Sequence, residues 1–165
     1  MVKIKHKELH RITSTAIIYK NNKYLIVQRA LDKKVFPGKW AIPGGGLEVD
    51  DYIDMPKTTK DLWYFAVEKS LRREIREEVN LEVDRIKYLL DIVHITSFGL
   101  PAIILSFYCP YKSGEVKIND EHTEFAWVTY KEAKKYDLIE GLLEEIEMVE
   151  KILKGKNENE IEYKH

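Results

Sequence analysis

Apolar and polar positions in the first half of the chain predict a β-hairpin and a further short strand. Thr13 to Tyr19 and Tyr24 to Gln28 are rich in apolar and β-branched residues, and the Lys20 to Lys23 segment between them contains two asparagines. Asparagine tolerates the positive φ that a tight turn requires, so the pattern is typical of a hairpin. Between two turns that contain proline and glycine, Lys39 to Ile42 is expected to form a brief strand or loop.

Helical periodicity follows, and the rest of the chain alternates between the two patterns. A helix is predicted from about Leu62 to Val79, with Asp61 as its N-cap. Further strands are expected at 86–96, 102–109 and 124–128, and helices at 131–136 and 140–153. Because one long helix separates two groups of strands and another helix closes the chain, the order predicts an α/β fold, with a mixed sheet sandwiched between helices.

Length and charge narrow the function classes. The 165 residues fit one domain, 1–165, with a polar tail from about 154 that is expected to fray. The net charge of -1 provides no general attraction for long nucleic acids or anionic membranes, so an anionic ligand must be held locally. The N-terminus has no apolar leader pattern and no segment approaches 18 apolar residues, so a cytoplasmic location is expected.

Three glutamates on the long helix are the first candidates for chemistry. Glu74, Glu77 and Glu78 stand at i, i+3 and i+4, which brings their carboxylates to neighbouring positions on one face. Such a face suits a hard cation, since Mg²⁺ prefers oxygen ligands and is often shared with substrate phosphates. Taken alone, the same pattern also fits a solvated face balanced by nearby arginines.

A glycine triplet upstream favours the first interpretation. Gly44, Gly45 and Gly46 would let the backbone approach a ligand closely, where side chains would obstruct it. A lone glycine triplet is more often only a turn. The triplet followed by an Arg-Glu pair and a Glu-Glu pair, after a hairpin, is a much more specific combination.

In this combination the sequence resembles the Nudix hydrolase family, whose motif is Gly, five residues, Glu, seven residues, then Arg-Glu-hydrophobe-any-Glu-Glu-any-Gly-hydrophobe. The second half of the motif is matched at Arg73, Glu74, Ile75, Glu77, Glu78 and Leu81. The flanking segments WAIPGGG (40–46) and FAWV (125–128) also look like the family, and the resemblance covers roughly 13–136. It implies a Nudix-like α/β/α sandwich that hydrolyses a phosphoanhydride bond in a nucleoside diphosphate linked to another group.

The sequence departs from the motif at two places. Asn80 stands where the family has glycine, and asparagine is the residue best able to adopt a left-handed helix cap. Counting from Gly45, the first acid falls at Asp51, but the arginine stands at 73 rather than 59, so the motif carries 14 extra residues (73 minus 59). Asp51 is one candidate for the first acid, with Asp50, Asp54 and Glu68 as rivals.

The resemblance also implies roles for individual residues. The three helix glutamates would ligate or orient Mg²⁺, or Mn²⁺ as a substitute, with the carbonyl of Gly45 as an extra ligand. Arg73 would hold Glu77 by a charge-assisted hydrogen bond. A distant loop glutamate, for which Glu121 is preferred over Glu124, would complete the catalytic and metal-binding set.

Substrate contacts and substrate identity are less constrained by the sequence. Arg29, at the end of the second hairpin strand, could meet a phosphate, and Trp63 could stack on a base, although core packing suits Trp63 better. The extra residues at 52–65 are expected to form a structured flap, with an extension of the helix as the alternative. A (deoxy)nucleoside triphosphate is the first expectation for the substrate. A nucleotide sugar, ADP-ribose, a dinucleoside polyphosphate and a non-catalytic nucleotide sensor are the alternatives. The expected partner is a small nucleotide, and a homodimer is left open.

Overall fold

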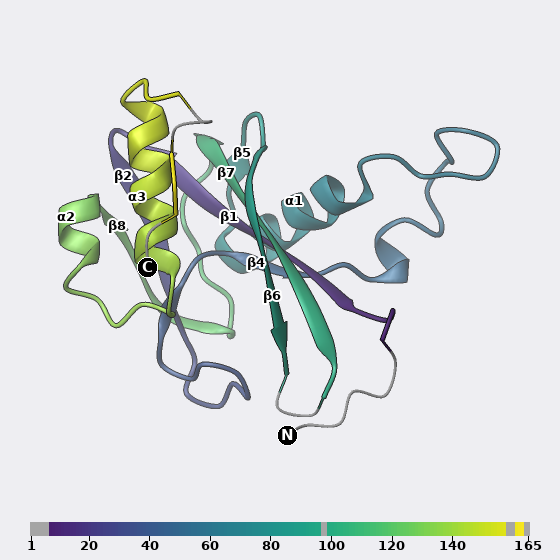
Figure 1. Cartoon of the computed structure of the whole chain (residues 1–165), viewed down its shortest axis with the longest axis horizontal. Coiled ribbons are helices and arrows are strands. Elements are labelled where there is room, and N and C mark those ends of the chain that lie inside the picture. Colours follow the sequence, from purple (N-terminus) through teal and green to yellow (C-terminus); the bar gives the residue numbers. More distant parts are fainter. Residues whose placement is uncertain (1–6, 97–98, 158–160, 164–165) are drawn as a thin grey trace.

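The computed structural model describes residues 7–96, 99–157 and 161–163, which form strands, three α-helices and one short 3-10 helix. In chain order these elements are β1 (Arg11–Lys20), β2 (Lys23–Arg29), β3 (Trp40–Ala41), β4 (Gly44–Gly46), η1 (Val49–Asp51), α1 (Ala66–Val79), β5 (Glu82–Val83), β6 (Lys87–Ile95), β7 (Pro101–Ser113), β8 (His122–Val128), α2 (Tyr130–Ala133) and α3 (Leu142–Leu153). Figure 1 shows how they are arranged.

One mixed sheet organises these elements. Its central path runs β3-β2-β1-β7-β5, and β4, β6 and β8 pair with β1, β7 and β2 respectively. The long β1 and β7 strands are parallel over nine residue pairs, from Arg11↔Ala102 to Tyr19↔Pro110, while the remaining pairs are antiparallel. The predicted mixed sheet is therefore confirmed.

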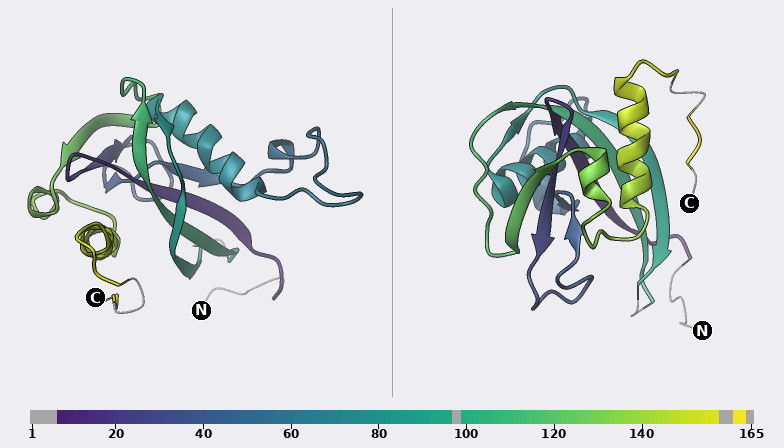
Figure 2. Two further views of the ribbon diagram at one scale, coloured as in Figure 1. Left: turned by 90° about the horizontal axis from the view of Figure 1, so that it is seen from above. Right: turned by 90° about the vertical axis from the view of Figure 1, so that its left-hand side faces the viewer.

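The two faces of this sheet carry separate hydrophobic clusters. Side chains alternate along β1, so Ala16 and Ile18 pack in the cluster with helix α1, whereas Ile17 packs in the cluster with helix α3. In Figure 2 the two helices lie on opposite sides of the strands. The structure is thus the predicted α/β/α sandwich.

The β1–β2 hairpin follows the sequence prediction closely. Asn21 and Asn22 have φ values of 51° and 58°, the left-handed conformation that a two-residue hairpin turn requires. Strands β1 and β2 extend beyond the predicted limits by one or two residues at each end. The turn residues therefore fix the register from which the rest of the sheet is built.

Two local predictions were wrong. Helix α1 begins at Ala66, four residues later than expected, because Phe65 adopts a left-handed conformation (φ 61°), and the N-cap is Phe65 rather than Asp61. The glycine triplet is not a turn but strand β4, which pairs antiparallel with 13–15 of β1. The short strand β5 was not expected at all.

The extra residues between η1 and α1 form a projecting loop rather than an extension of the helix (Figure 1). Trp63 donates its indole N–H to the carbonyl of Met55 at 2.9 Å and packs against the ring of Tyr52. Backbone hydrogen bonds from Thr58 and Thr59 to the carbonyl of Leu62 close the loop. The loop is therefore internally structured, and Trp63 stabilises it instead of packing in a core cluster, which corrects the expectation for this residue.

In the described part of the chain, no helix is long and apolar enough to cross a membrane. The prediction of a fraying tail falls partly on residues outside those described.

Candidate active site

Helix α1 is oriented by its apolar stripe. Leu71, Ile75 and Val79 are fully buried against the sheet, as the i, i+4 spacing predicts. Glu74 and Glu78 therefore occupy a neighbouring stripe that faces strand β4, while the Glu77 side chain is 55% exposed. At the end of the helix, Asn80 takes the left-handed conformation (φ 57°) in place of the family glycine, and its N–H bonds to the carbonyl of Arg76. The predicted cap is confirmed.

Strand β4 is so closely packed that no side chain fits at Gly44 or Gly45, and at Gly45 the neighbour is helix α1. A Cβ on Gly45 would lie 2.2 Å from the carboxyl carbon of Glu74, and one on Gly44 would lie 2.2 Å from the carbonyl oxygen of Ser14. The backbone N–H of Gly44 donates to Oε2 of Glu78 at 2.9 Å. Glycine at position 45 thus allows the backbone to meet the carboxylate of Glu74 directly, while glycine at position 44 fits against β1 and its N–H reaches Glu78.

Glu78 is a buried carboxylate with little compensation. Its side chain belongs to a residue only 5% exposed, and burial raises its pKa to about 8, with further increases from Glu74 and Glu121. The N–H of Gly44 and the charge of Arg29 act in the opposite direction. Burial likewise raises the pKa of Glu74. Carboxylates in this state are stabilised by a nearby cation.

Arg73 joins the helix to the root of the inserted loop. Its guanidinium contacts Asp51 at 2.5 Å, Glu74 at 2.9 Å and Glu77 at 2.9 Å. The hydrogen bond from Arg73 is the main reason why the pKa of Asp51 falls to about 2. Among the four acids considered for the first motif position, Asp51 is therefore the one in contact with Arg73. Glu68 instead pairs with Arg72.

Glu121 comes to the same region from the far half of the sequence. It lies in the turn before β8, and the N–H of Asn119 in this segment bonds to the backbone carbonyl of Glu78 at 3.2 Å. Its carboxylate forms an ion pair with Lys33 at 2.9 Å, which lowers its pKa. The structure thus brings Glu121 near Glu78, as the resemblance implies. Glu124 is exposed on β8.

Arg29 acts on these acids through its charge, whereas Trp63 has its described contacts within the inserted loop. Nε of Arg29 donates to the carbonyl of Val35 at 2.9 Å, and its positive charge acts on Glu78 and Glu121. Trp63 belongs to the inserted loop, on the N-terminal side of α1. The phosphate contact of Arg29 and base stacking by Trp63 both remain predictions.

Among the described residues, no three histidine, cysteine, aspartate or glutamate side chains already converge into a metal cage. Glu74 and Glu77 turn to Arg73, Glu78 to Gly44, and Glu121 to Lys33. The donor set nevertheless fits a hard divalent cation, because it consists of carboxylate groups, and the buried carboxylate of Glu78 has no described ion pair. The sequence did not reveal Lys33 as a neighbour of the site, because no local pattern indicates its ion pair with Glu121, which lies 88 positions further along the chain (121 minus 33).

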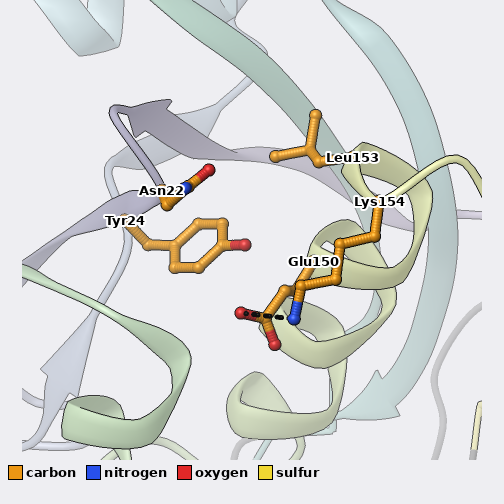
Figure 3. Close-up of a pocket in the computed structure, with 5 residues that line it drawn as sticks. All are labelled: Asn22, Tyr24, Glu150, Leu153 and Lys154. Carbon is orange, nitrogen blue, oxygen red and sulfur yellow. Dashed lines mark ion pairs between the residues drawn. The ribbon is translucent and has the colours of Figure 1, made fainter.

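The pocket in Figure 3 lies elsewhere. Its volume is about 220 Å³, and it is lined by the β1–β2 turn and the end of α3, with Tyr24, Glu150 and Lys154 among its residues. Tyr24 belongs to the hydrophobic cluster on the α3 face, and the glutamates of α1 lie on the other face. This pocket is smaller than a typical ligand site, at about 300 to 1,000 Å³, and it takes no part in the candidate active site.

Comparison with known proteins identifies the class to which this fold and site belong. The family model described as NUDIX domain matches residues 9–149, and the chain belongs to this family. Proteins named nucleoside triphosphatase NudI are similar in sequence. The NudI protein of Enterobacter sp. (strain 638) is 33% identical over 135 residues, and the match covers 76% of this chain and 86% of the NudI chain. That of Escherichia coli (strain K12) is 35% identical over 132 residues, covering 74% and 84%.

Solved structures agree with this assignment at the level of the fold. The crystal structure of a MutT NUDIX hydrolase from Burkholderia pseudomallei superposes with a TM-score of 0.67 at 22% identity, covering 85% of this chain and 98% of that one. The predicted family, the α/β/α fold, and an enzyme that hydrolyses a phosphoanhydride bond in a nucleotide are confirmed. Members of the family generally use a divalent metal ion.

Proposed function

We propose that the chain cleaves a (deoxy)nucleoside triphosphate into the monophosphate and pyrophosphate, with Mg²⁺ as the metal ion and Mn²⁺ as a substitute. The observation that carries the proposal is the contact between β4 and α1, where glycine backbone and two glutamates meet without intervening side chains. The proposal for the triphosphate is supported by the NudI relatives, which are named as nucleoside triphosphatases.

The residues that would hold the ion are Glu74, Glu77, Glu78 and Glu121, with the carbonyl oxygen of Gly45 as a further ligand. All are oxygen donors, which suits Mg²⁺ better than a softer metal. When bound, such an ion polarises the phosphoanhydride and makes water a better nucleophile at neutral pH.

The chain's own residues prepare this site before any ligand enters. The N–H of Gly44 fixes one carboxylate oxygen of Glu78, and Arg73 fixes the carboxylates of Glu74 and Glu77. Asp51 in turn holds the Arg73 guanidinium from a side chain only 4% exposed. Arg73 and Asp51 are therefore proposed as positioning residues, and Arg29 as a cation for the phosphates.

A product assay tests this proposal. The purified chain is incubated with Mg²⁺ and each common ribo- and deoxyribonucleoside triphosphate, and pyrophosphate and orthophosphate are measured separately. Pyrophosphate with the nucleoside monophosphate is the expected result, whereas orthophosphate would mean cleavage at the terminal anhydride and would contradict it. A nucleotide sugar, ADP-ribose and a dinucleoside polyphosphate complete the panel. Higher kcat/KM for one of these would replace the triphosphate as the substrate. The cytoplasmic location and a homodimer stay predictions.

A further inference from the structure

The loop between β2 and β3 brings a lysine to the acidic side of the candidate site. The N–H of Ala30 bonds to the backbone carbonyl of Glu121 at 2.9 Å, which ties the start of this loop to the turn before β8. Three residues later, Nζ of Lys33 lies 2.9 Å from Oε2 of Glu121, and the N–H of Lys33 bonds back to the carbonyl of Ala30 at 3.3 Å. A backbone anchor and a side-chain ion pair therefore hold Lys33 at Glu121.

This ion pair neutralises one acid of the site, whereas Glu78 has no described ion pair, and the cation that influences it is the more distant Arg29. The hydrogen bond from Lys33 is the largest influence that lowers the pKa of Glu121. Glu78, which is electrostatically coupled to Glu121, has no cation in hydrogen-bonding contact in the described structure, and its only described side-chain hydrogen bond is to the N–H of Gly44. Lys33 and a bound divalent ion would therefore compete for the carboxylate of Glu121.

The negative charge of the substrate gives Lys33 a second partner. A nucleoside triphosphate carries more negative charge than one divalent ion neutralises, so further cations must face its phosphates. Arg29 is one such cation, but its Nε is committed to the carbonyl of Val35. Lys33 has a long side chain whose ammonium can turn to a new acceptor without a fixed geometry.

We propose that Lys33 exchanges partners when the metal-bound nucleotide enters. In the free protein it pairs with Glu121, and in the complex it binds a phosphate oxygen while the Glu121 carboxylate becomes free for the metal ion. The exchange is feasible because the pair is partly solvated, with the two side chains 28% and 46% exposed, and ion pairs this exposed contribute little stability. The proposal rests on the proposed function, since it requires a phosphate-containing substrate.

Two binding measurements test the exchange without turnover. Calorimetric titration with Mg²⁺ alone should give a Kd about 3- to 10-fold lower for Lys33→Gln than for the original chain, because a competitor for Glu121 is removed. Titration of the Mg²⁺-saturated protein with inorganic tripolyphosphate should give the opposite sign, a Kd about tenfold higher for Lys33→Gln. Loss of a nearby positive charge would by itself give the same two signs, so the exchange is distinguished by the dependence of the Mg²⁺ effect on the Glu121 carboxylate.

Three further variants serve as controls for Lys33→Gln. Lys34→Gln removes the same charge from the exposed neighbouring residue and should leave both constants unchanged, and Lys33→Arg should preserve them by keeping the charge. In a Glu121→Gln background, Lys33→Gln should no longer tighten Mg²⁺ binding. With a nucleoside triphosphate, Lys33→Gln should raise KM about tenfold with little change in kcat.

The proposal is overturned if Lys33→Gln matches Lys34→Gln in both titrations, or if it weakens Mg²⁺ binding. It is equally overturned if kcat falls while KM and tripolyphosphate binding stay constant. A chain that hydrolyses no nucleoside triphosphate would contradict the proposed function only, because both titrations are read without hydrolysis.

Discussion

Replacing Gly45 by alanine should inactivate the enzyme while leaving the fold intact. The added Cβ would lie 2.2 Å from the carboxyl carbon of Glu74 and 2.3 and 2.6 Å from its two oxygens. Ordinary van der Waals contact begins near 3.4 Å, so the carboxylate must retreat by about 1.2 Å (3.4 minus 2.2). A displacement of about 1 Å at a catalytic group can reduce the rate about 100-fold, and kcat of Gly45→Ala is expected to fall by that order.

The loss in stability should be much smaller than the loss in activity. The obstructing atoms belong to the end of a glutamate side chain, which can rotate away, rather than to backbone. Thermal unfolding of the metal-free protein should therefore give a Tm within a few degrees of the original, whereas Mg²⁺ binding measured by calorimetry should weaken. Gly155→Ala, where a Cβ meets nothing within 4 Å, shows the cost of the substitution without an obstructing side chain. Its φ of 82° adds a backbone strain that Gly45, which is not at positive φ, does not have, so the loss in Tm should be no larger at Gly45. If Gly45→Ala keeps near-normal kcat and Mg²⁺ affinity, the reasoning that strand β4 positions Glu74 for the metal is refuted.

Three further changes probe other parts of the site. Glu78→Gln should lower kcat at least about 100-fold, and an unchanged kcat would make the acidic face a solvated surface. The same change should raise the Tm of the metal-free protein at pH 8. The pKa of Glu78 is raised to about 8, so its contribution to stability is present below the unfolded pKa and is lost as the pH rises through 8, whereas glutamine stays neutral. Asp51→Asn should lower kcat about tenfold, because it releases Arg73. The pKa of Asp51 is lowered to about 2, so its contribution to folding stability is present above the unfolded pKa of about 3.8 and is lost as the pH falls toward 2. The difference in Tm between Asp51→Asn and the original should therefore shrink on acidification, and a constant difference would exclude this ion pair as its cause. Shortening the inserted loop at 53–59 should change KM and the ranking of nucleotides more than the metal dependence; a lower Tm with unchanged ranking would mean that the loop only supports the fold.

Local sequence patterns predicted the parts of the molecule that local physics determines. The hairpin was predictable because two consecutive asparagines both adopt positive φ, and the core face of α1 because Leu71, Ile75 and Val79 recur at helical spacing. Asn80 was predictable as a left-handed cap for the same reason. In each case the residues that decide the conformation lie within one or two turns of each other.

Long-range contacts account for the features that the sequence did not reveal. The glycine triplet was predicted as a turn because glycines are usually turn residues, and only its pairing with 13–15 of β1 makes it a strand. The start of α1 is displaced by Phe65, whose left-handed conformation no propensity predicts. Asp51 remained one of four candidates because 21 residues separate it from Arg73 (positions 52–72), and the pairing of Lys33 with Glu121 had no local signal.

The metal dependence of nucleotide hydrolysis tests the central claim most directly. The purified chain is stripped of metal with EDTA, and pyrophosphate release from the nucleoside triphosphates is followed as Mg²⁺ or Mn²⁺ is added back, with the Tm recorded in parallel. The account predicts no turnover in EDTA, restored turnover with either ion, and a Tm that rises as the ion binds, because the ion binds only the folded site and relieves the repulsion among the carboxylates. Undiminished pyrophosphate release in excess EDTA would contradict it.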